Sequence, residues 1–440
     1  MMSRKGDGRV VQRVVIADDL TGASDAGLQF AKRGLRTTVW LDFYPGLREI
    51  DADVLVCDTD GRAATWHRAL WRMQGLLGRI HPLTPSRIIK KMDSTLRGNL
   101  GPELRALLDA MPDAIAIVCP AFPKQGRVCR DGILYVHGVR VDESDFARDP
   151  LSPVRDARVA AQLEAPAALL TLTELRAGTA HAHDEIERAR TLGIRIIVAD
   201  AETDDDLRTL ATLARLRDDV LWTGSAGLLE YLADDVAQCH PDPSTSSGGG
   251  CATIVPPARG PVVFIVGSRS DMTQRQIEAF AAHPGHDTEL IGAIDLMENS
   301  FAVTRKSVGA AEALQRGMDT LIAVDGGSYG ISRALETGRA YNWGSRRTSQ
   351  RIRDRLVAMV DESVRSDSGA TVVLSGGDVA RAFCEHRGIR GLELIGEVAP
   401  GIPISRAIGA NLRVVTKAGG FGHANTYLDI AAALHAKAIT

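Results

Sequence analysis

Short hydrophobic runs alternate with longer segments of helical periodicity along most of the chain. In the first half these runs predict strands at residues 12–17, 37–41, 53–57, 87–92, 114–119, 167–172, 194–199 and 220–223. In the second half they predict a long helix near residues 349–363 and strands at residues 262–266, 287–291, 320–324, 371–374, 392–395 and 412–415. Such alternation is typical of a mainly parallel sheet with helices on both faces, so we expect an α/β fold.

Two interruptions of this pattern divide the chain further. Residues 126–149 break into hairpin-like pieces, which we expect to form a surface excursion near the ligand-binding edge. Residues 241–260 are rich in proline, serine and glycine, which is typical of a linker. A chain of 440 residues also exceeds what one hydrophobic core usually serves. We therefore expect two domains, residues 1–240 and 261–440, joined by the linker.

Composition narrows the class of partner. With 45% hydrophobic residues, 24% charged residues and a net charge of -3, the chain offers no electrostatic surface for nucleic acid or an anionic membrane. No hydrophobic run is long enough for a signal peptide or a membrane span, so we expect a cytoplasmic protein that binds small metabolites. The six cysteines are too sparse for a disulfide framework. The sequence leaves the oligomeric state open between a monomer and a homodimer.

Two adjacent carboxylates, Asp18 and Asp19, follow the first predicted strand and precede a helical pattern. Ligands of open α/β sheets bind outside the carboxyl ends of the strands, which is where this pair is expected to lie. An aspartate at such a position can also simply cap the following helix. Capping needs one such residue rather than two, so the pair favours a functional role for at least one of them.

A second polar group follows the strand predicted at 87–92, within the sequence KKMDSTLRGNLGPEL. It brings Lys91, Asp93, Ser94 and Arg97 to one strand end. Lysine and arginine pair with a substrate carboxylate, while aspartate and serine bind hydroxyl groups. A solvated loop with a helix cap is the alternative interpretation. Arg62 follows a third strand in the same way, which is a weak signal by itself.

The predicted strand ends of the second half carry glycines instead of charges. Three of these turns are GSRS at residues 267–270, SGGD at 375–378 and KAGGFG at 417–422. Glycine lets backbone N–H groups converge on an anion, so three such turns indicate a nucleotide's phosphates, although each alone can be only a tight connection. The role of a fourth turn, DGGSYG at 325–330, stays undecided.

Two common nucleotide-binding motifs are missing from the sequence. There is no G-x-x-x-x-G-K-[ST], and no G-x-G-x-x-G follows the first predicted strand of either half. A P-loop NTPase and a standard Rossmann dehydrogenase are therefore disfavoured. Acids and cations in one domain with phosphate-binding turns in the other instead fit phosphoryl transfer in a cleft between the domains.

The motifs together resemble a known family over nearly the whole chain. The segments that carry the resemblance are IADDLTGASDAG, KKMDSTLRGNLGPE, VVFIVGS, LSGGD, EVAPGIP and TKAGGFG, in that order. They are similar to those of the four-carbon acid sugar kinases. The resemblance implies an N-terminal substrate domain, a C-terminal nucleotide domain, and ATP-dependent phosphorylation of the terminal hydroxyl of threonate, erythronate or 3-oxo-tetronate. The form KKMDSTLRGN looks closest to the D-threonate kinases.

The same resemblance assigns the site residues. It implies contact with the sugar acid by Asp18, Asp19, Arg62, Lys91, Met92, Asp93 and Ser94. It implies contact with ATP by Ser268, Ser375, Gly376, Gly377, Asp378, Gly419 and Gly420. We expect Arg62 and Lys91 to neutralise the substrate carboxylate and Asp93 or Asp19 to accept a proton, with Mg²⁺ accompanying ATP through ligands that the sequence does not identify.

Several alternatives stay open at this point. D-erythronate, L-threonate, 3-oxo-tetronate or another small hydroxy acid or sugar could be the acceptor. A protein of another class, a nucleotide or metabolite sensor that binds without turnover, is disfavoured because a binder rarely needs paired carboxylates facing an anionic ligand.

Overall fold

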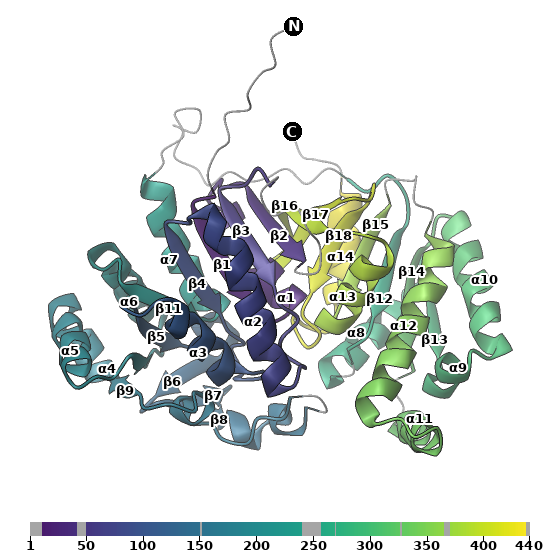
Figure 1. The fold of residues 1–440 in the computed structure, drawn as a ribbon. Helices are drawn as coiled ribbons and strands as arrows, with labels where there is room; N and C mark the ends of the chain where they lie inside the picture. Colours follow the sequence, from purple (N-terminus) through teal and green to yellow (C-terminus); the bar gives the residue numbers. More distant parts are fainter. Residues whose placement is uncertain are drawn as a thin grey trace, which may run out of the picture. The chain divides into compact units, whose positions relative to one another are not determined.

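The computed structural model describes residues 11–41, 50–149, 152–239, 257–268, 270–325, 328–364 and 370–436. The chain divides into two compact units, residues 1–251 and 252–440, which we call unit 1 and unit 2 (Figure 1). Most of the linker expected at residues 241–260 lies outside the described residues.

Unit 1 is built on a parallel sheet with the strand order β2-β3-β1-β4-β11-β5-β10-β9. All neighbouring pairs in this order run parallel. The parallel direction brings the carboxyl ends of its strands to one edge, which is where the predicted substrate residues follow. The strands are β1 (Arg13–Ala17), β2 (Thr37–Leu41), β3 (Val54–Asp58), β4 (Arg87–Lys91), β5 (Ile115–Cys119), β9 (Ala168–Leu170), β10 (Ile196–Ala199) and β11 (Val220–Gly224).

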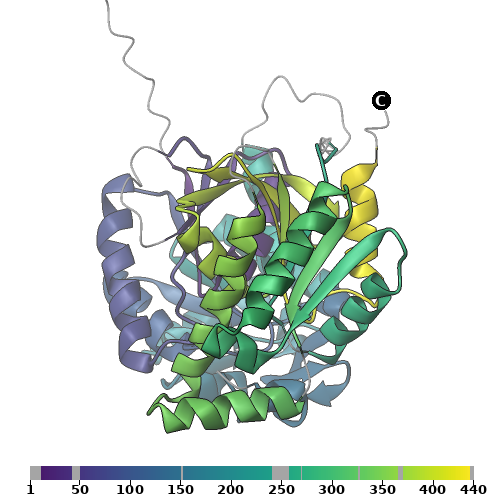
Figure 2. The ribbon, with the colours of Figure 1, turned by 90° about the vertical axis from the view of Figure 1, so that its right-hand side faces the viewer.

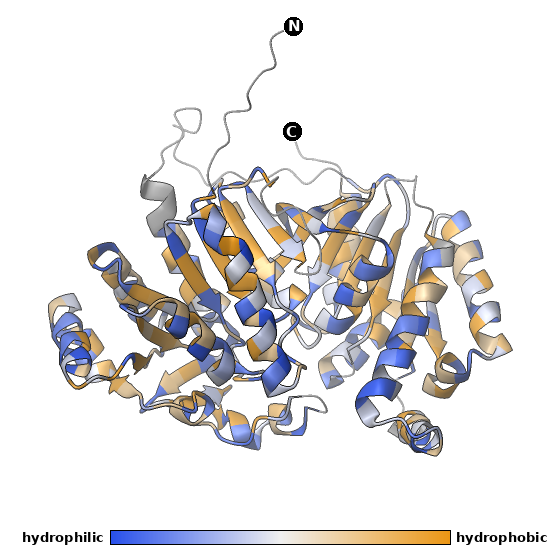
Figure 3. Ribbon diagram, in the orientation of Figure 1, coloured by the Kyte–Doolittle hydropathy of each residue, from blue (hydrophilic) through white to orange (hydrophobic). Residues whose placement is uncertain are grey.

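Helices cover both faces of this sheet. On one face α1 packs against α7, and on the other α2 packs against α3 (Figure 1). The strands are mainly hydrophobic, whereas the helices also carry hydrophilic positions (Figure 3). This difference is expected for a sheet buried on both faces. The helices are α1 (Leu20–Ala31), α2 (Trp66–Ile80), α3 (Leu100–Ala110), α4 (Leu172–Arg176), α5 (Thr179–Thr191), α6 (Asp204–Leu216) and α7 (Ala226–Cys239).

The expected excursion is a small antiparallel sheet of three strands, β6 (Arg127–Arg130), β7 (Ile133–Val136) and β8 (Val139–Arg140). Bridges from Arg127 to Phe122, from Cys129 to Ala201 and from Ile133 to Arg158 join it to the rest of unit 1. Arg127, the first residue of β6, contacts the segment after β4 by a side-chain hydrogen bond to Ser94. The excursion therefore reaches the strand-end region, as the sequence predicted.

The strands of unit 2 lie side by side in the order β13-β14-β12-β15-β18-β17-β16. The first five strands run parallel, while β17 is antiparallel to both of its neighbours. The sequence did not predict β17, which forms a hairpin with a β16 longer than expected. The strands are β12 (Val262–Val266), β13 (His286–Ile291), β14 (Asp319–Val324), β15 (Thr371–Ser375), β16 (Gly391–Ala399), β17 (Ile402–Ile408) and β18 (Arg413–Lys417).

The core of unit 2 lies between its sheet and the helices α8 and α14. Phe264 of β12 packs there against Phe280 and Tyr427, with ring centroids 4.9 and 5.7 Å away. Other helices, among them α10 and α12, pack together and against β14 (Figure 2). The helices are α8 (Asp271–Ala281), α9 (Ala293–Glu298), α10 (Phe301–Gln315), α11 (Ser328–Ala340), α12 (Ser345–Ser363), α13 (Gly377–His386) and α14 (Thr426–His435).

The structure confirms the predicted α/β class. Most predicted strands agree with the observed ones to within one or two residues at each end. None of the described helices has both the length and the apolar character needed to cross a membrane.

Candidate active site

Asp19 begins helix α1 as its N-cap. Its Oδ1 accepts a hydrogen bond of 3.0 Å from the backbone N–H of Gly22, and its Oδ2 accepts one of 2.7 Å from Thr21. One aspartate of the pair thus caps the helix, which was the simpler of the two interpretations. The cap leaves Asp18, directly after β1, without a role in starting the helix.

Arg62 gathers three carboxylates at this strand end. Its Nε and Nη2 donate to Asp18 at 3.0 and 2.8 Å, a two-pronged contact, while Nη2 lies 2.7 Å from Asp19 and 3.5 Å from Asp93. Burial alone would raise the pKa of Asp18, but Arg62 and Lys90 outweigh it and hold that pKa below its usual value. Asp18 is therefore ionised at neutral pH, and Arg62 fixes the positions of the three aspartates.

Gly98 allows the next connection to approach this cluster. Its φ is +105°, and a Cβ at this position would lie 2.8 Å from Asp18 Oδ2. A side chain would be both strained and too close, so glycine is needed here.

Asp93, after β4, is held mainly by Arg97. The guanidinium donates to both of its oxygens, at 2.9 and 3.2 Å, and Thr95 donates a further hydrogen bond. Against the opposing effect of burial, Arg97 and Arg62 hold the pKa of Asp93 well below its usual range. Arg97 also reaches Asp149, 3.3 Å away. Asp93 is thus a fixed anion and a weak base.

The two adjacent lysines of β4 point to opposite sides. Lys90 is 1% exposed and pairs with the equally buried Glu103 of α3 at 2.8 Å. Lys91 Nζ donates to the carbonyl of Met92 at 2.8 Å and lies 3.4 Å from where a Cβ on Gly22 would sit. Lys91 therefore places its ammonium group beside the start of α1, next to the carboxylate cluster.

Three glycine turns converge in unit 2. The Cβ of an alanine at position 419 would lie 2.3 Å from Ser268 Oγ, and one at position 376 would lie 3.5 Å from the backbone nitrogen of Ser268. The ends of β12, β15 and β18 thus meet within van der Waals distance. Such an assembly of backbone groups at strand ends suits an anionic ligand.

Hydrogen bonds fix these turns. Thr273 Oγ1, in the first turn of α8, lies 2.8 Å from Ser268 Oγ and 2.9 Å from the carbonyl of Gly419. Lys417 Nζ donates to the carbonyls of Ala418 and Gly419, at 3.0 and 2.7 Å. Burial lowers the pKa of Lys417 to about 7, because a charge is costly to bury at this position.

Comparison with known proteins supports the division of the chain into two functionally different units. The sequence matches a sugar-binding N-terminal domain over residues 13–232 and a nucleotide-binding C-terminal domain over residues 263–427. It is 33% identical over 429 residues to a D-threonate kinase of Cupriavidus necator, covering 93% of this chain and 94% of the relative. It is 30% identical over 442 residues to a D-erythronate kinase of Heliobacterium modesticaldum, with 94% of each covered.

The chain belongs to the four-carbon acid sugar kinase family. It is accordingly a phosphotransferase that acts on an alcohol group. Its fold is also that of a crystal structure of a Salmonella typhimurium protein named as a tRNA synthase, with a TM-score of 0.75 over 95% of this chain and 98% of that one. The sequence identity there is 23%, so this likeness concerns the fold alone.

In this kinase the sequence-predicted residues fall into two groups. Hydrogen bonds and ion pairs join Asp18, Asp19, Arg62 and Asp93 in unit 1, with Lys91, Met92 and Ser94 on the same segment as Asp93. In unit 2 Ser268, Gly376 and Gly419 converge, and Gly377 and Asp378 begin α13. Ser375 is fully buried, and its hydroxyl accepts a hydrogen bond of 2.8 Å from Tyr427, so its side chain already has a partner within unit 2.

Sequence reasoning missed the contribution of the excursion. Arg127 donates a hydrogen bond to Ser94, and the ring of Phe146 lies 5.2 Å from the Arg97 guanidinium and 6.0 Å from that of Arg127. The break in the strand–helix alternation was the available signal, but it did not identify these side chains. The undecided turn at 325–330 lies partly outside the described residues.

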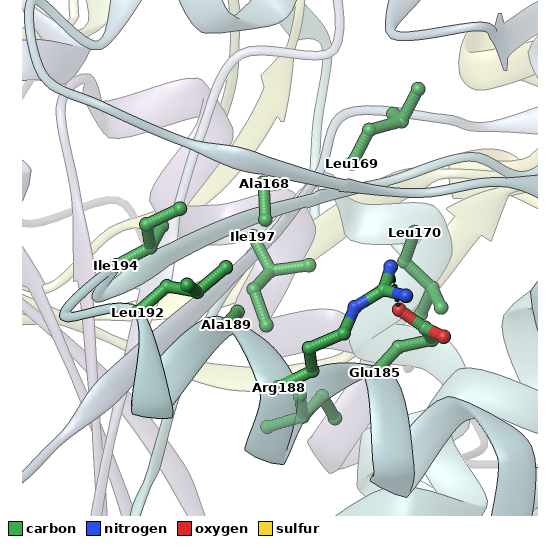
Figure 4. Close-up of a pocket in the computed structure, with 10 residues that line it drawn as sticks. Ala168, Leu169, Leu170, Glu185, Arg188, Ala189, Leu192, Ile194 and Ile197 are labelled. Carbon is green, nitrogen blue, oxygen red and sulfur yellow. Dashed lines mark ion pairs between the residues drawn. The ribbon is translucent and has the colours of Figure 1, made fainter.

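One small cavity lies away from both groups. It has a volume of about 140 Å³ and is lined by residues of β9, α5 and β10, including Leu169, Ile186 and Ile197 (Figure 4). Arg188 and Glu185 form an ion pair beside it. None of the predicted site residues lines this cavity, so it adds nothing to the kinase site.

Proposed function

We propose that this chain transfers the γ-phosphoryl group of MgATP to the terminal 4-hydroxyl of a four-carbon sugar acid, with D-threonate as the preferred acceptor. The observation that carries the proposal is the ion-pair cluster of unit 1, in which Arg62 joins Asp18, Asp19 and Asp93 beside Lys91. The D-threonate kinase of Cupriavidus necator supports the choice of acid.

The cluster provides what a hydroxy acid needs. Lys91, beside Arg62, supplies an ammonium group for the substrate carboxylate. The substrate's hydroxyl groups can donate to the carboxylates of Asp93 and Asp19 and can hydrogen-bond to the hydroxyl of Ser94. In phosphoryl transfer the protein mainly positions groups and stabilises charge, so a weak base such as Asp93 suffices to orient the reacting hydroxyl and receive its proton.

The glycine turns of unit 2 supply the nucleotide site in this proposal. Backbone N–H groups near Ser268, at the start of α13 and at Gly419 and Gly420 would contact the phosphates. The described residues include no group of three His, Cys, Asp or Glu side chains suited to a metal ion. In this proposal Mg²⁺ arrives with ATP, because such ions take most of their ligands from phosphates, water and one or two carboxylates. Asp378 in the first turn of α13 is the candidate carboxylate.

An ADP-release assay tests this function. Purified protein with MgATP would be given D-threonate, D-erythronate, L-threonate and 3-oxo-tetronate, and kcat/KM compared. We expect turnover with these acids and the highest value for D-threonate. The Heliobacterium relative makes D-erythronate the second candidate, and a higher kcat/KM for that acid would replace the first. Thermal stabilisation by these ligands without ADP release would instead indicate a sensor.

A further inference from the structure

Most charged side chains of the unit 1 site already have partners of opposite charge. Arg62 contacts three aspartates, Arg97 contacts Asp93 and Asp149, and Lys90 contacts Glu103. Arg127 is different, because within the described part of the chain no carboxylate forms an ion pair with it. A guanidinium group left in this way retains its capacity to bind an anion.

The surroundings of Arg127 exclude water from part of this group. Its Nη1 donates to Ser94 Oγ, and its Nε is buried without a hydrogen-bond partner among the described atoms. The ring of Phe146 lies 6.0 Å away. Burial is the main cause that lowers the pKa of Arg127; Arg97 and Arg62 act in the same direction, while Asp93 and Asp25 oppose them. A buried donor without an acceptor costs free energy, which a bound anion would recover.

We propose that Arg127 binds the carboxylate of the sugar acid. The hydrogen bond to Ser94 places Arg127 at the segment that carries Lys91 and Asp93, and the unused Nε belongs to the edge with which arginine grips a carboxylate. Arg62 is less suited to this role, because its Nε and Nη2 already face aspartates. This inference rests on the proposed function, and it places the carboxylate end of the substrate next to the excursion.

Two carboxylates near Arg127 could be considered as its partner instead. Asp93 is already bound by Arg97 through both of its oxygens. Asp25 of α1 lies close enough for Arg127 and Lys91 to affect its pKa, but no ion pair joins it to either. The remaining alternative is that Arg127 only supports Ser94 and Phe146, without touching the substrate.

Binding of a charged and an uncharged ligand separates these two roles. We would measure the affinity of the wild type, Arg127→Gln and Arg127→Lys for D-threonate and for its neutral amide by calorimetry. Loss of a desolvated charge contact should weaken D-threonate binding at least about 30-fold in Arg127→Gln, and leave amide binding within about 3-fold. Arg127→Lys should recover part of the affinity for the acid only. Arg130→Gln, on the same strand but exposed and paired with Glu202, is the matched control.

Equal losses for acid and amide in Arg127→Gln would mean a supporting role and overturn the proposal, as would unchanged affinity for the acid. Nucleotide binding and the unfolding temperature of each variant show whether it is folded, and Arg127→Lys serves if the glutamine variant is not. The proposed function fails separately, through a wild type that does not turn over any four-carbon acid. If the wild type turns over D-threonate and the Arg127→Gln variant has an unchanged KM for it, only the role of Arg127 is contradicted and the proposed function stands.

Discussion

Arg62 is the cation that lies between the three carboxylates of the unit 1 site. Asp18 and Asp19 are consecutive residues, and Asp93 joins them from a different strand end. Three carboxylates so close together repel one another unless a cation lies between them. The guanidinium suits this position because its rigid planar fork can contact several oxygens at fixed angles.

Replacing Arg62 should therefore abolish the geometry of the site. We expect Arg62→Ala and Arg62→Lys to lower kcat/KM for D-threonate at least about 100-fold, since misplaced catalytic groups commonly cost that much. Lysine should not rescue, because its single ammonium cannot hold three carboxylates. Arg68→Ala, an exposed arginine of the following helix, serves as the control. Activity in Arg62→Lys within a few-fold of the wild type would contradict this account.

The raised pKa of Asp25 predicts that the free energy of unfolding depends on pH. Asp25 lies three residues after Gly22 on α1, and burial raises its pKa to about 6 despite the opposing effects of Lys91 and Arg127. The pKa of Asp25 is higher in the folded state than in the unfolded state. Its contribution to the free energy of unfolding is therefore fully present below pH 4 and is lost as the pH rises through about 6. Asp25→Asn should thus be more stable than the wild type at pH 8, by about 1–2 kcal/mol, and the difference should shrink towards pH 5. Thermal unfolding across this range measures it, and a constant difference would refute the assignment.

At the scale of secondary structure, both units place their candidate groups after parallel strands. Unit 1 follows its strands with charged side chains, while unit 2 follows them with tight glycine turns. The difference suits two ligands, because hydroxyls and a carboxylate need side-chain partners whereas phosphates are bound well by backbone N–H groups.

The glycine turns give a direct substitution test. In Gly419→Ala the new Cβ would lie 2.3 Å from Ser268 Oγ, so two of the converging turns must separate. We expect KM for ATP to rise about 10-fold or more, because in the proposed function the misplaced backbone donors bind the nucleotide, while binding of D-threonate is unchanged. Gly344→Ala, where no atom lies within 4 Å of the added Cβ, is the control. An unchanged KM for ATP would remove this turn from the nucleotide site.

The sequence predicted the strands well where a hydrophobic run was short and bounded by polar residues, as at β2 and β12. It missed β17, because Ile402 to Ile408 contains a proline and a charged residue, which a strand of irregular antiparallel pairing tolerates. It also left the excursion without assigned side chains. Whether Arg127 meets Ser94 depends on tertiary packing between residues 33 positions apart, which periodicity does not encode.

For the whole molecule, the division into two units matches the chemistry of a two-substrate transfer. The sequence indicated which segments gather at each site, since strand ends of a parallel sheet share one edge. It did not indicate that Asp19 caps α1, that Arg62 forms ion pairs with the aspartates, or that Ser375 accepts a hydrogen bond from Tyr427. These features depend on which partner each side chain meets, and several residues could have served.

The most direct test of the central claim is the identity of the product. Wild-type protein, MgATP and D-threonate would be incubated, and the phosphorylated product examined by proton-coupled phosphorus NMR. Transfer to the terminal hydroxyl predicts a new phosphate ester whose phosphorus couples to the two methylene protons of C4, formed in step with ADP. Coupling to a single methine proton, or release of inorganic phosphate alone, would contradict the account.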